Sequence, residues 1–246
     1  MSRRVAWVSA GAASAIAAKL GAPDVLAYCE TAAEDADNAR FLHDVERWIG
    51  MDVVRLKSER YRDTWDVWEQ ERYMAGIYGA PCTRELKRIP RENWQHADDI
   101  HIFGYTADAA DVRRAAMLRE NWPEMCIETP LIERGLTKEG CLAMLSSAGI
   151  QPPRVYAMGL QNANCIPCVK ATSPSYWALV RREFPAEFRR AAEMSRRLGV
   201  RLTRLSGSRA HIDEIPADHS TTNPISPACD MLCQMAEMEM SPGGEG

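Results

Sequence analysis

Short apolar runs alternate with helix-like segments along the first half of the chain. The runs have the length of buried strands and lie at 4–8, 25–28, 51–56, 100–103 and, more weakly, 126–128. Helical patterns follow three of them, one ending near Gly21 and the others covering 37–48 and 108–120. Strands that alternate with helices predict an α/β fold with a doubly wound parallel sheet, which binds ligands at the carboxyl ends of its strands.

The pattern changes after Thr137, where the chain becomes mostly helical. This residue is the predicted N-cap of a helix that ends near residue 148, and two more helices are predicted at 175–182 and 185–198. From Ser206 onward, glycine, serine, proline and aspartate predominate. That composition predicts a loop-rich tail, and we expect its last six residues to be disordered.

The length of 246 residues and the 46% content of apolar residues fit one globular domain. We divide it into an α/β core (1–135), a helical part of the same domain (136–205) and the tail (206–246). A net charge of −4 argues against a surface that binds nucleic acid throughout, although the arginine-rich segment 181–204 is a candidate for a local basic groove. The alternative for that segment is a solvated face of two surface helices.

The sequence contains no apolar run of the roughly 18 residues that a membrane span requires, and no signal-peptide pattern. We therefore expect a cytoplasmic protein that does not bind membranes. In such a reducing compartment, the eight cysteines indicate metal or redox chemistry and not disulfides.

Three of these cysteines form the most informative pattern in the chain. Cys165 and Cys168 form a Cys-x-x-Cys pair, and Cys82 lies roughly eighty residues upstream. Two thiolates at this spacing can bind one metal or cluster, and a third from a distant loop can complete the site. The pattern predicts an iron–sulfur or a zinc site.

The roles of the other cysteines are less constrained by their positions. Cys141 or Cys233 is a possible fourth ligand, although Cys141 on a predicted helix also fits the core. Cys29 and Cys126 lie on or beside predicted strands and are expected in the core. Cys229, near the end of the chain, is free to do chemistry, and the alternatives for it are a plain surface cysteine or a second metal pair.

The turn between the first predicted strand and helix is a candidate anion site. It reads Ser-Ala-Gly-Ala-Ala-Ser at 9–14, and small residues there let backbone N–H groups approach a phosphate closely. Ser9 and Ser14 add hydroxyl donors. The alternative is a turn that carries small residues only for packing.

This turn resembles the Ser-Gly-Gly-x-x-Ser pyrophosphate loop of the adenine nucleotide α-hydrolase superfamily. Ala10 replaces its first glycine, and Ala13 stands where ATP-hydrolysing members often carry aspartate. After the second strand, Cys-Glu-Thr-Ala at 29–32 resembles the Asp-Thr-Gly loop of the phosphoadenosine phosphosulfate (PAPS) reductase branch, with Glu30 for aspartate and Ala32 for glycine.

Further segments resemble the same branch, so the similarity spans nearly the whole chain. The segment 82–87 is similar to its Cys-Cys/Thr-x-x-x-Lys motif, and 104–114 to an arginine-containing loop, with Thr106 in place of the first arginine. The run 162–170 resembles the Asn-x-Asn-Cys-Ile-Gly-Cys-Val-Lys motif of compact, often phage- or prophage-encoded members, with Pro167 for glycine.

The resemblance implies a nucleotide-binding core and a four-iron, four-sulfur cluster on Cys82, Cys165 and Cys168, with Lys87 or Lys170 offsetting its charge. Zinc is the alternative metal. It further implies that a mobile terminal segment carries a nucleophilic cysteine, here Cys229, although the neighbouring Asp230 departs from the glycine of the family.

The resemblance thus implies a sulfonucleotide reductase that releases sulfite from PAPS or adenylyl sulfate and takes electrons from a small thiol-redox protein. The residues expected to bind the substrate are Ser9, Ala10, Gly11, Ser14, Glu30, Thr31, Arg84, Lys87, Arg113 and Arg209. Two alternatives remain open. One is an ATP-dependent thiolating enzyme that acts on nucleic acid, and the other is a non-catalytic nucleotide-binding redox sensor.

Overall fold

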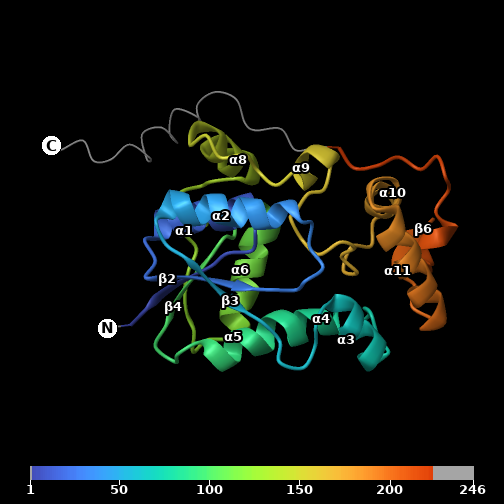
Figure 1. Ribbon diagram of the computed structural model, residues 1–246, viewed down its shortest axis with the longest axis horizontal. Coiled ribbons are helices and arrows are strands. Elements are labelled where there is room, and N and C mark those ends of the chain that lie inside the picture. The colour runs from blue at the N-terminus through green and yellow to red at the C-terminus, as the bar shows by residue number, and fades with distance from the viewer. Residues whose placement is uncertain (1, 224–246) are drawn as a thin grey trace.

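The computed structural model describes residues 2–223 and confirms the predicted α/β doubly wound fold. Five strands form one parallel sheet in the order β3-β2-β1-β4-β5 (Figure 1). They are β1 (Arg4–Trp7), β2 (Val25–Cys29), β3 (Val53–Leu56), β4 (Ile100–Phe103) and β5 (Cys126–Glu128). All five coincide with predicted strands to within two residues at each end.

The strand order creates a switch point between β1 and β4. The chain winds from β1 to β2 to β3 in one direction, then returns to place β4 on the other side of β1 and β5 beyond it. In the register of this pair, Trp7 lies opposite Phe103. Because the connections leave β1 and β4 in opposite directions, a crevice is expected at the carboxyl ends of these two strands.

Helices cover both faces of the sheet (Figure 1). On one face lie α1 (Ala12–Gly21), α2 (Asp37–Ile49) and α8 (Lys138–Ser147), and on the other lies α5 (Ile89–Trp94). Alternate residues of each strand point to opposite faces. Ala6, Val8, Leu26 and Tyr28 accordingly belong to the main hydrophobic core, whereas Val5, Trp7, Ala27 and Leu56 pack in a smaller cluster that includes Trp94.

Between β3 and β4 the chain forms helices that the apolar pattern does not predict. They are α3 (Thr64–Glu71), α4 (Pro81–Thr83) and the π-helix η1 (Arg84–Arg88), which continues into α5. Asp63 caps α3 by accepting a hydrogen bond from the N–H of Asp66 at 2.8 Å. This insertion carries Cys82 and Lys87 towards the carboxyl end of the sheet.

Three further helices come before or after β5 and α8 along the chain. They are α6 (Ala109–Asn121), α7 (Pro130–Glu133) and α9 (Val155–Met158). Thr137 caps α8, as predicted, by accepting a hydrogen bond from the N–H of Gly140 at 3.2 Å. Among helices in the described part of the chain, none has both the length and the apolar character needed to cross a bilayer.

The last described elements are α10 (Pro174–Glu183), α11 (Pro185–Arg197), β6 (Thr203–Leu205), β7 (Ser208–Ala210) and the 3-10 helix η2 (Ile212–Glu214). Both long helices were predicted, and Trp177, Leu179 and Phe188 join the same hydrophobic cluster as Leu26. The described part of the predicted tail, 206–223, contains β7 and η2 between turns and irregular segments. A tight turn with positive φ at Ser206 and Gly207 allows this hairpin to form.

Candidate functional site

A cavity of about 380 Å³ opens at the carboxyl ends of β1, β2 and β4. The residues after β1 and β4 lie on either side of the switch point, where an open α/β sheet binds its ligand. The lining consists of Trp7, Val8, Ser9, Ser14, Tyr28, Cys29, Thr83, Lys87, Arg88, Arg91, Phe103, Gly104, Tyr105 and Trp122. Five of these fourteen residues are aromatic and three are cationic, which suits a ligand that has both a ring and negative charge.

One wall of the cavity is a row of aromatic rings. The rings of Trp7 and His101 stack with centroids 6.1 Å apart, His101 stacks on Phe103 at 6.3 Å, and Tyr105 lies 5.9 Å from Phe103. The indole Nε1 of Trp7 donates a hydrogen bond to Nδ1 of His101 at 3.0 Å. Burial lowers the pKa of His101, which keeps the imidazole neutral so that it can accept this bond. The wall is therefore held in place before any ligand arrives.

The opposite side of the cavity is cationic. Lys87, Arg88 and Arg91 lie on η1 and α5, and Lys87 and Arg91 share one helical face because they are four residues apart. Burial lowers the pKa of Arg91, and its Nε has no hydrogen-bond partner within the described chain. A buried guanidinium group with an unpaired N–H is a favourable partner for an anionic ligand.

The loop after β1 presents two serines to the cavity and is braced by internal hydrogen bonds. The Ser14 hydroxyl donates to the Gly11 carbonyl at 2.9 Å and accepts from the Ser9 N–H at 3.0 Å. Tyr156 closes the other side of the loop, because its hydroxyl accepts a hydrogen bond from the N–H of Ala12 at 3.3 Å. Part of the hydrogen-bonding capacity at the start of α1 is thus used by the protein itself.

Gly104 brings β4 against this loop. A Cβ atom at position 104 would lie 2.6 Å from both N and Cα of Ser14, a distance that no side chain tolerates. The close approach of the two backbones therefore requires glycine, and it places the ends of β1 and β4 on the same cavity.

Two alanines hold a left-handed backbone in the loops after β1 and β2. The φ angles are 53° at Ala10 and 51° at Ala32. At both positions the similar loops described in the sequence analysis carry glycine. Glycine adopts the left-handed conformation without strain. The two departures from the family motifs therefore keep a backbone conformation that glycine favours.

Cys82, Cys165 and Cys168 all interact electrostatically with Lys87. Negative charge at Cys168 raises the pKa of both Cys82 and Cys165, and Lys87 lowers both. The loop with the Cys-x-x-Cys pair is fixed to the loop after β2, because Ile166 N–H donates to the Ala33 carbonyl at 2.7 Å. The structure thus brings a distant cysteine and the pair to the same region beside the cavity.

Burial is the main influence on these thiols. It raises the pKa of Cys165 to about 11 and the pKa of Cys82 above its ordinary value. The Sγ atom of Cys165 donates a hydrogen bond to the Thr31 hydroxyl at 3.1 Å. Burial also tends to lower the pKa of Lys87, but the neighbouring Cys165 and Glu34 outweigh it and raise that pKa. Without a metal, the thiols of Cys82 and Cys165 are therefore protonated beside a charged lysine.

Three thiols can hold an iron–sulfur cluster or a zinc ion, and the two differ in how close the sulfur atoms must lie. A zinc ion binds each thiolate at about 2.3 Å, which would bring the sulfur atoms to within about 4 Å of one another. Within residues 2–223, the one group of three possible ligand atoms that are mutually within 4.8 Å contains no cysteine. In a four-iron cluster each cysteine binds a separate iron, so the sulfur atoms lie farther apart.

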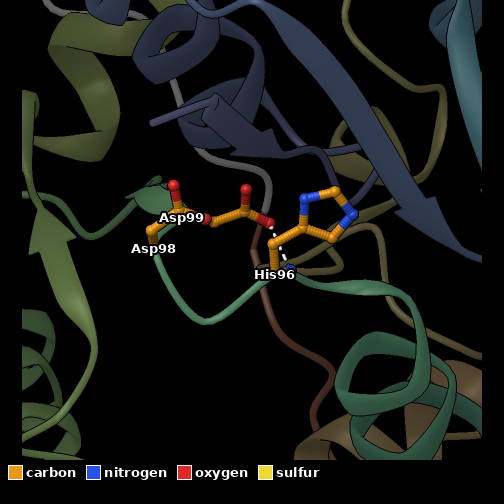
Figure 2. Close-up of side chains that lie close together, drawn as sticks. All are labelled: His96, Asp98 and Asp99. Carbon is orange, nitrogen blue, oxygen red and sulfur yellow. Dashed lines mark hydrogen bonds between the residues drawn. The ribbon is translucent and has the colours of Figure 1, made fainter. Parts of the chain in front are cut away.

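That one group is His96, Asp98 and Asp99, which come together in the loop before β4 (Figure 2). Asp99 is buried and its two carboxylate oxygens accept hydrogen bonds from Arg3 at 2.9 and 2.7 Å. It also accepts from the backbone N–H of His96 at 2.8 Å. A carboxylate that already binds a guanidinium group in this way serves to hold the loop and is a poor ligand for a cation.

Comparison with protein-family models, curated proteins and solved structures found no match for this chain. The function of this chain is therefore inferred from the geometry of its cavity and of its three-cysteine site.

Several of the residues expected to bind substrate lie elsewhere. Glu30 forms an ion pair with Lys57 at 3.1 Å, and Arg84 forms one with Glu85 at 2.5 Å. Arg113 is exposed on α6. Of the ten predicted substrate residues, Ser9, Ser14 and Lys87 line the cavity.

Other predicted residues take different places. Thr31 is buried beneath the Cys-x-x-Cys loop, and Arg209 lies on β7. Cys141 is fully buried, its pKa is raised to about 12 by burial, and its charged neighbours are Asp108 and Lys138, not the other thiols. Cys229 and Cys233 lie outside the described residues.

Two cysteines expected in the core are not there. Cys126 is exposed on the edge strand β5, and Cys29 is half-buried and lines the cavity. The prediction failed because both residues occupy the last or first position of a strand, where a side chain meets the rim of the sheet. Cys29 donates a hydrogen bond to the Lys87 carbonyl at 3.4 Å, and burial raises its pKa to about 11.

The sequence interpretation missed most of the cavity lining. Trp7 and Phe103 were detectable, because both are aromatic residues at the ends of predicted strands. Arg88 and Arg91 gave no comparable signal, since the helices that carry them come from a segment without a clear periodic pattern. Trp122 directly follows α6, which was predicted, but nothing in that pattern indicates that its ring lines the cavity.

Proposed function

We propose that this protein is a sulfonucleotide reductase that resembles PAPS reductase and releases sulfite from an adenylyl sulfate compound. The observation that best supports this proposal is the cavity at the switch point. One of its walls is aromatic, and its charged lining residues, Lys87, Arg88 and Arg91, are all cationic. The aromatic wall supports stacking of an adenine ring. The cations support binding of the adjacent phosphate and sulfate groups.

The charge of the cavity also favours a sulfonucleotide over ATP. Enzymes that use ATP generally bind it with Mg²⁺, which one or two carboxylates hold beside the phosphates. Here lysine and arginine side chains take the place where such carboxylates would be expected. A phosphate–sulfate mixed anhydride needs charge neutralisation but no metal, so its binding suits this lining.

Cys229 is proposed as the nucleophile, six residues after the last described residue, Asn223. Its thiolate would attack the sulfonate sulfur, forming an S–S bond as the S–O bond to phosphate breaks and the nucleotide leaves with that electron pair. A thiol of a small redox protein would then attack Cys229, forming a disulfide and releasing sulfite. Two thiols are oxidised to a disulfide while the sulfonate is reduced to sulfite.

The three-cysteine site is proposed to hold a four-iron, four-sulfur cluster. When bound, the cluster would supply fixed negative charge beside Lys87 and join two segments that are far apart in sequence. All six cysteines in the described residues are free thiols. Free thiols in this number support a reducing compartment, and we propose a cytoplasmic location.

The test combines nucleotide binding, turnover and metal content in anaerobically purified protein. Calorimetry should detect adenylyl sulfate or PAPS, and Lys87→Ala should weaken binding about 10- to 100-fold, as expected for one charge-assisted contact of 1.5–3 kcal/mol. Arg47→Ala, an exposed residue on α2, is the matched control. Cys229→Ser should retain binding and abolish sulfite release.

Metal analysis separates the cofactor from the reaction. Cys165→Ser should lose most of its iron and sulfide, whereas Cys126→Ser on the sheet edge should retain both. Pyrophosphate release from ATP without sulfite release would identify the thiolating alternative instead. Nucleotide binding without any turnover in the presence of a thiol donor would leave a binding protein and refute the reductase proposal.

A further inference from the structure

The hairpin formed by β6 and β7 carries arginines in an unfavourable arrangement. Arg204 and Arg209 lie directly opposite each other in the strand register, and both are exposed. Residues at such positions have Cβ atoms about 4.5–5.5 Å apart, and like charges there repel. Within residues 2–223, neither side chain has a carboxylate partner.

Neighbouring arginines are paired, which sets this hairpin apart. Arg196 at the end of α11 binds Asp213 at 2.9 Å and Glu214 at 3.0 Å, and Arg197 forms an ion pair with Glu69. Among the residues that the structure describes, carboxylates therefore pair with Arg196 and Arg197 next to the hairpin but not with the opposed pair. Unbalanced positive charge at a defined position is what a polyanion-binding surface requires.

The positions of these charges are fixed by the fold. The hairpin is attached to the loop that follows the Cys-x-x-Cys pair, because Arg204 N–H and the Thr203 hydroxyl both donate to the Thr172 carbonyl, at 3.2 and 3.0 Å. Arg209 extends the basic surface by donating to the carbonyl of the exposed Arg201 at 3.5 Å. Thr172 is four residues from Cys168, which limits their separation to about 14 Å.

The surface continues past Cys82. Lys170 is exposed and lies two residues after Cys168, hence within about 7 Å of it. Shortly before Cys82 in the chain, a tight turn closed by reciprocal Gly76 and Gly79 backbone hydrogen bonds of 3.0 Å presents Ile77 and Tyr78.

These two side chains are 90% and 89% exposed, an unusual placement for large apolar residues. Tyr78 is four residues from Cys82 and hence also within about 14 Å of it. Exposed arginines and an exposed aromatic ring, each close along the chain to a cysteine of this site, combine the two features by which proteins hold single strands, phosphate contacts and base stacking.

We infer that this surface, defined by Arg201, Arg204, Arg209, Lys170 and Tyr78, binds single-stranded nucleic acid across the cysteine site. An acidic protein would satisfy the arginines, but the exposed tyrosine ring favours a ligand that offers flat π-faces. The surface lies outside the nucleotide cavity, so the inference does not rest on the proposed reductase activity.

The test uses full-length protein and a fluorescently labelled single-stranded DNA or RNA of about 12 nucleotides, within the usual site size of single-strand binders. Anisotropy titrations over a range of salt concentrations should show binding that weakens as salt rises. The double variant Arg204→Glu with Arg209→Glu should lose at least tenfold in affinity. Its log–log salt slope should fall in magnitude by about 1.4, since each lost phosphate contact contributes about 0.7.

Matched controls distinguish the surface from general charge. Arg47→Glu with Arg55→Glu changes the charge by the same amount at exposed positions on α2 and β3 and should bind as the wild type does. Tyr78→Ala should weaken binding without changing the salt slope. Arg209→Glu alone should keep or raise the melting temperature, because it places opposite charges across the hairpin, while still weakening binding.

The inference is refuted if the wild type does not bind the oligonucleotide, or if both double variants bind it equally. Binding of an acidic peptide with no binding of either nucleic acid would show that the surface docks a protein instead, and would equally overturn it.

Discussion

Replacing Ala32 by glycine should make the protein more stable, although glycine is normally a destabilising substitution. Ala32 has a φ of 51° and is exposed in the loop after β2. The left-handed conformation costs a non-glycine residue about 1–2 kcal/mol, whereas glycine loses about 0.5–1 kcal/mol more backbone entropy than alanine on folding. The difference predicts a gain of about 0.5–1 kcal/mol in the free energy of unfolding.

Ala10 provides an internal comparison, because its backbone is equally left-handed but its methyl group is only 1% exposed. Removing a buried methyl group costs about 0.8 kcal/mol in lost transfer free energy. That loss offsets the relief of strain, so Ala10→Gly should be close to neutral. Ala116→Gly, at an exposed position of α6 with helical backbone, should cost about 1 kcal/mol.

Urea unfolding of the three variants and the wild type measures these differences, provided that the slope with denaturant is unchanged. For a chain of this size, 1 kcal/mol also corresponds to a shift of about 2–4 °C in melting temperature. The expected order of stability is Ala32→Gly, then Ala10→Gly together with the wild type, then Ala116→Gly. Destabilisation of Ala32→Gly by as much as Ala116→Gly would refute the strained-loop argument.

Three further outcomes follow from the site. Gly104→Ala should lower the free energy of unfolding by about 1–3 kcal/mol and abolish nucleotide binding in calorimetry, because its Cβ would collide with the backbone of the first loop. His101→Phe should weaken nucleotide binding and shift tryptophan fluorescence, because Trp7 loses its hydrogen-bond acceptor. In metal-free protein, urea unfolding should show a free energy of unfolding that falls from about pH 9 to about pH 11. Burial raises the pKa of Cys29 and Cys165 to about 11. In this pH range the folded state therefore retains protons that the unfolded state releases. Cluster-loaded protein should keep a weaker dependence, since the ligand thiol of Cys165 is then already deprotonated.

The sequence predicted the sheet well because its strands are short apolar runs separated by turns. Runs such as 25–28 and 100–103 are buried on both faces, and such strands need no tertiary information to be recognised. The insertion between β3 and β4 was not predicted, since α3 combines charged residues with Trp65 and Trp68, whose burial depends on partners that are distant in sequence. One of these partners is Arg190, which lies over the Trp65 ring at 4.2 Å.

The same reasoning explains the uneven prediction of the site. Residues of the connection from β1 into α1, such as Ser9 and, in the first turn of the helix, Ser14, have positions set by the local pattern and were identified. Arg84 and Lys87 were proposed together from one motif, but η1 turns Lys87 into the cavity and leaves Arg84 paired with Glu85. Which of two nearby cations faces a ligand depends on helical phase, and the π-helical turn changes that phase in a way that residue spacing does not reveal.

The arrangement of charges around Lys87 links the two parts of the site. Lys87 lines the nucleotide cavity and also lies among Cys165, Cys168 and Cys29, so its ammonium group is shared between a bound anion and the thiols. Lys87 would stabilise both an anion in the cavity and a negatively charged cluster. Each of these bound groups would weaken the attraction of Lys87 for the other. Filling one part should therefore lower the affinity of the other unless Arg91 takes over the charge of the nucleotide. Its buried, unpaired Nε gives this chain a second cation suited to that role.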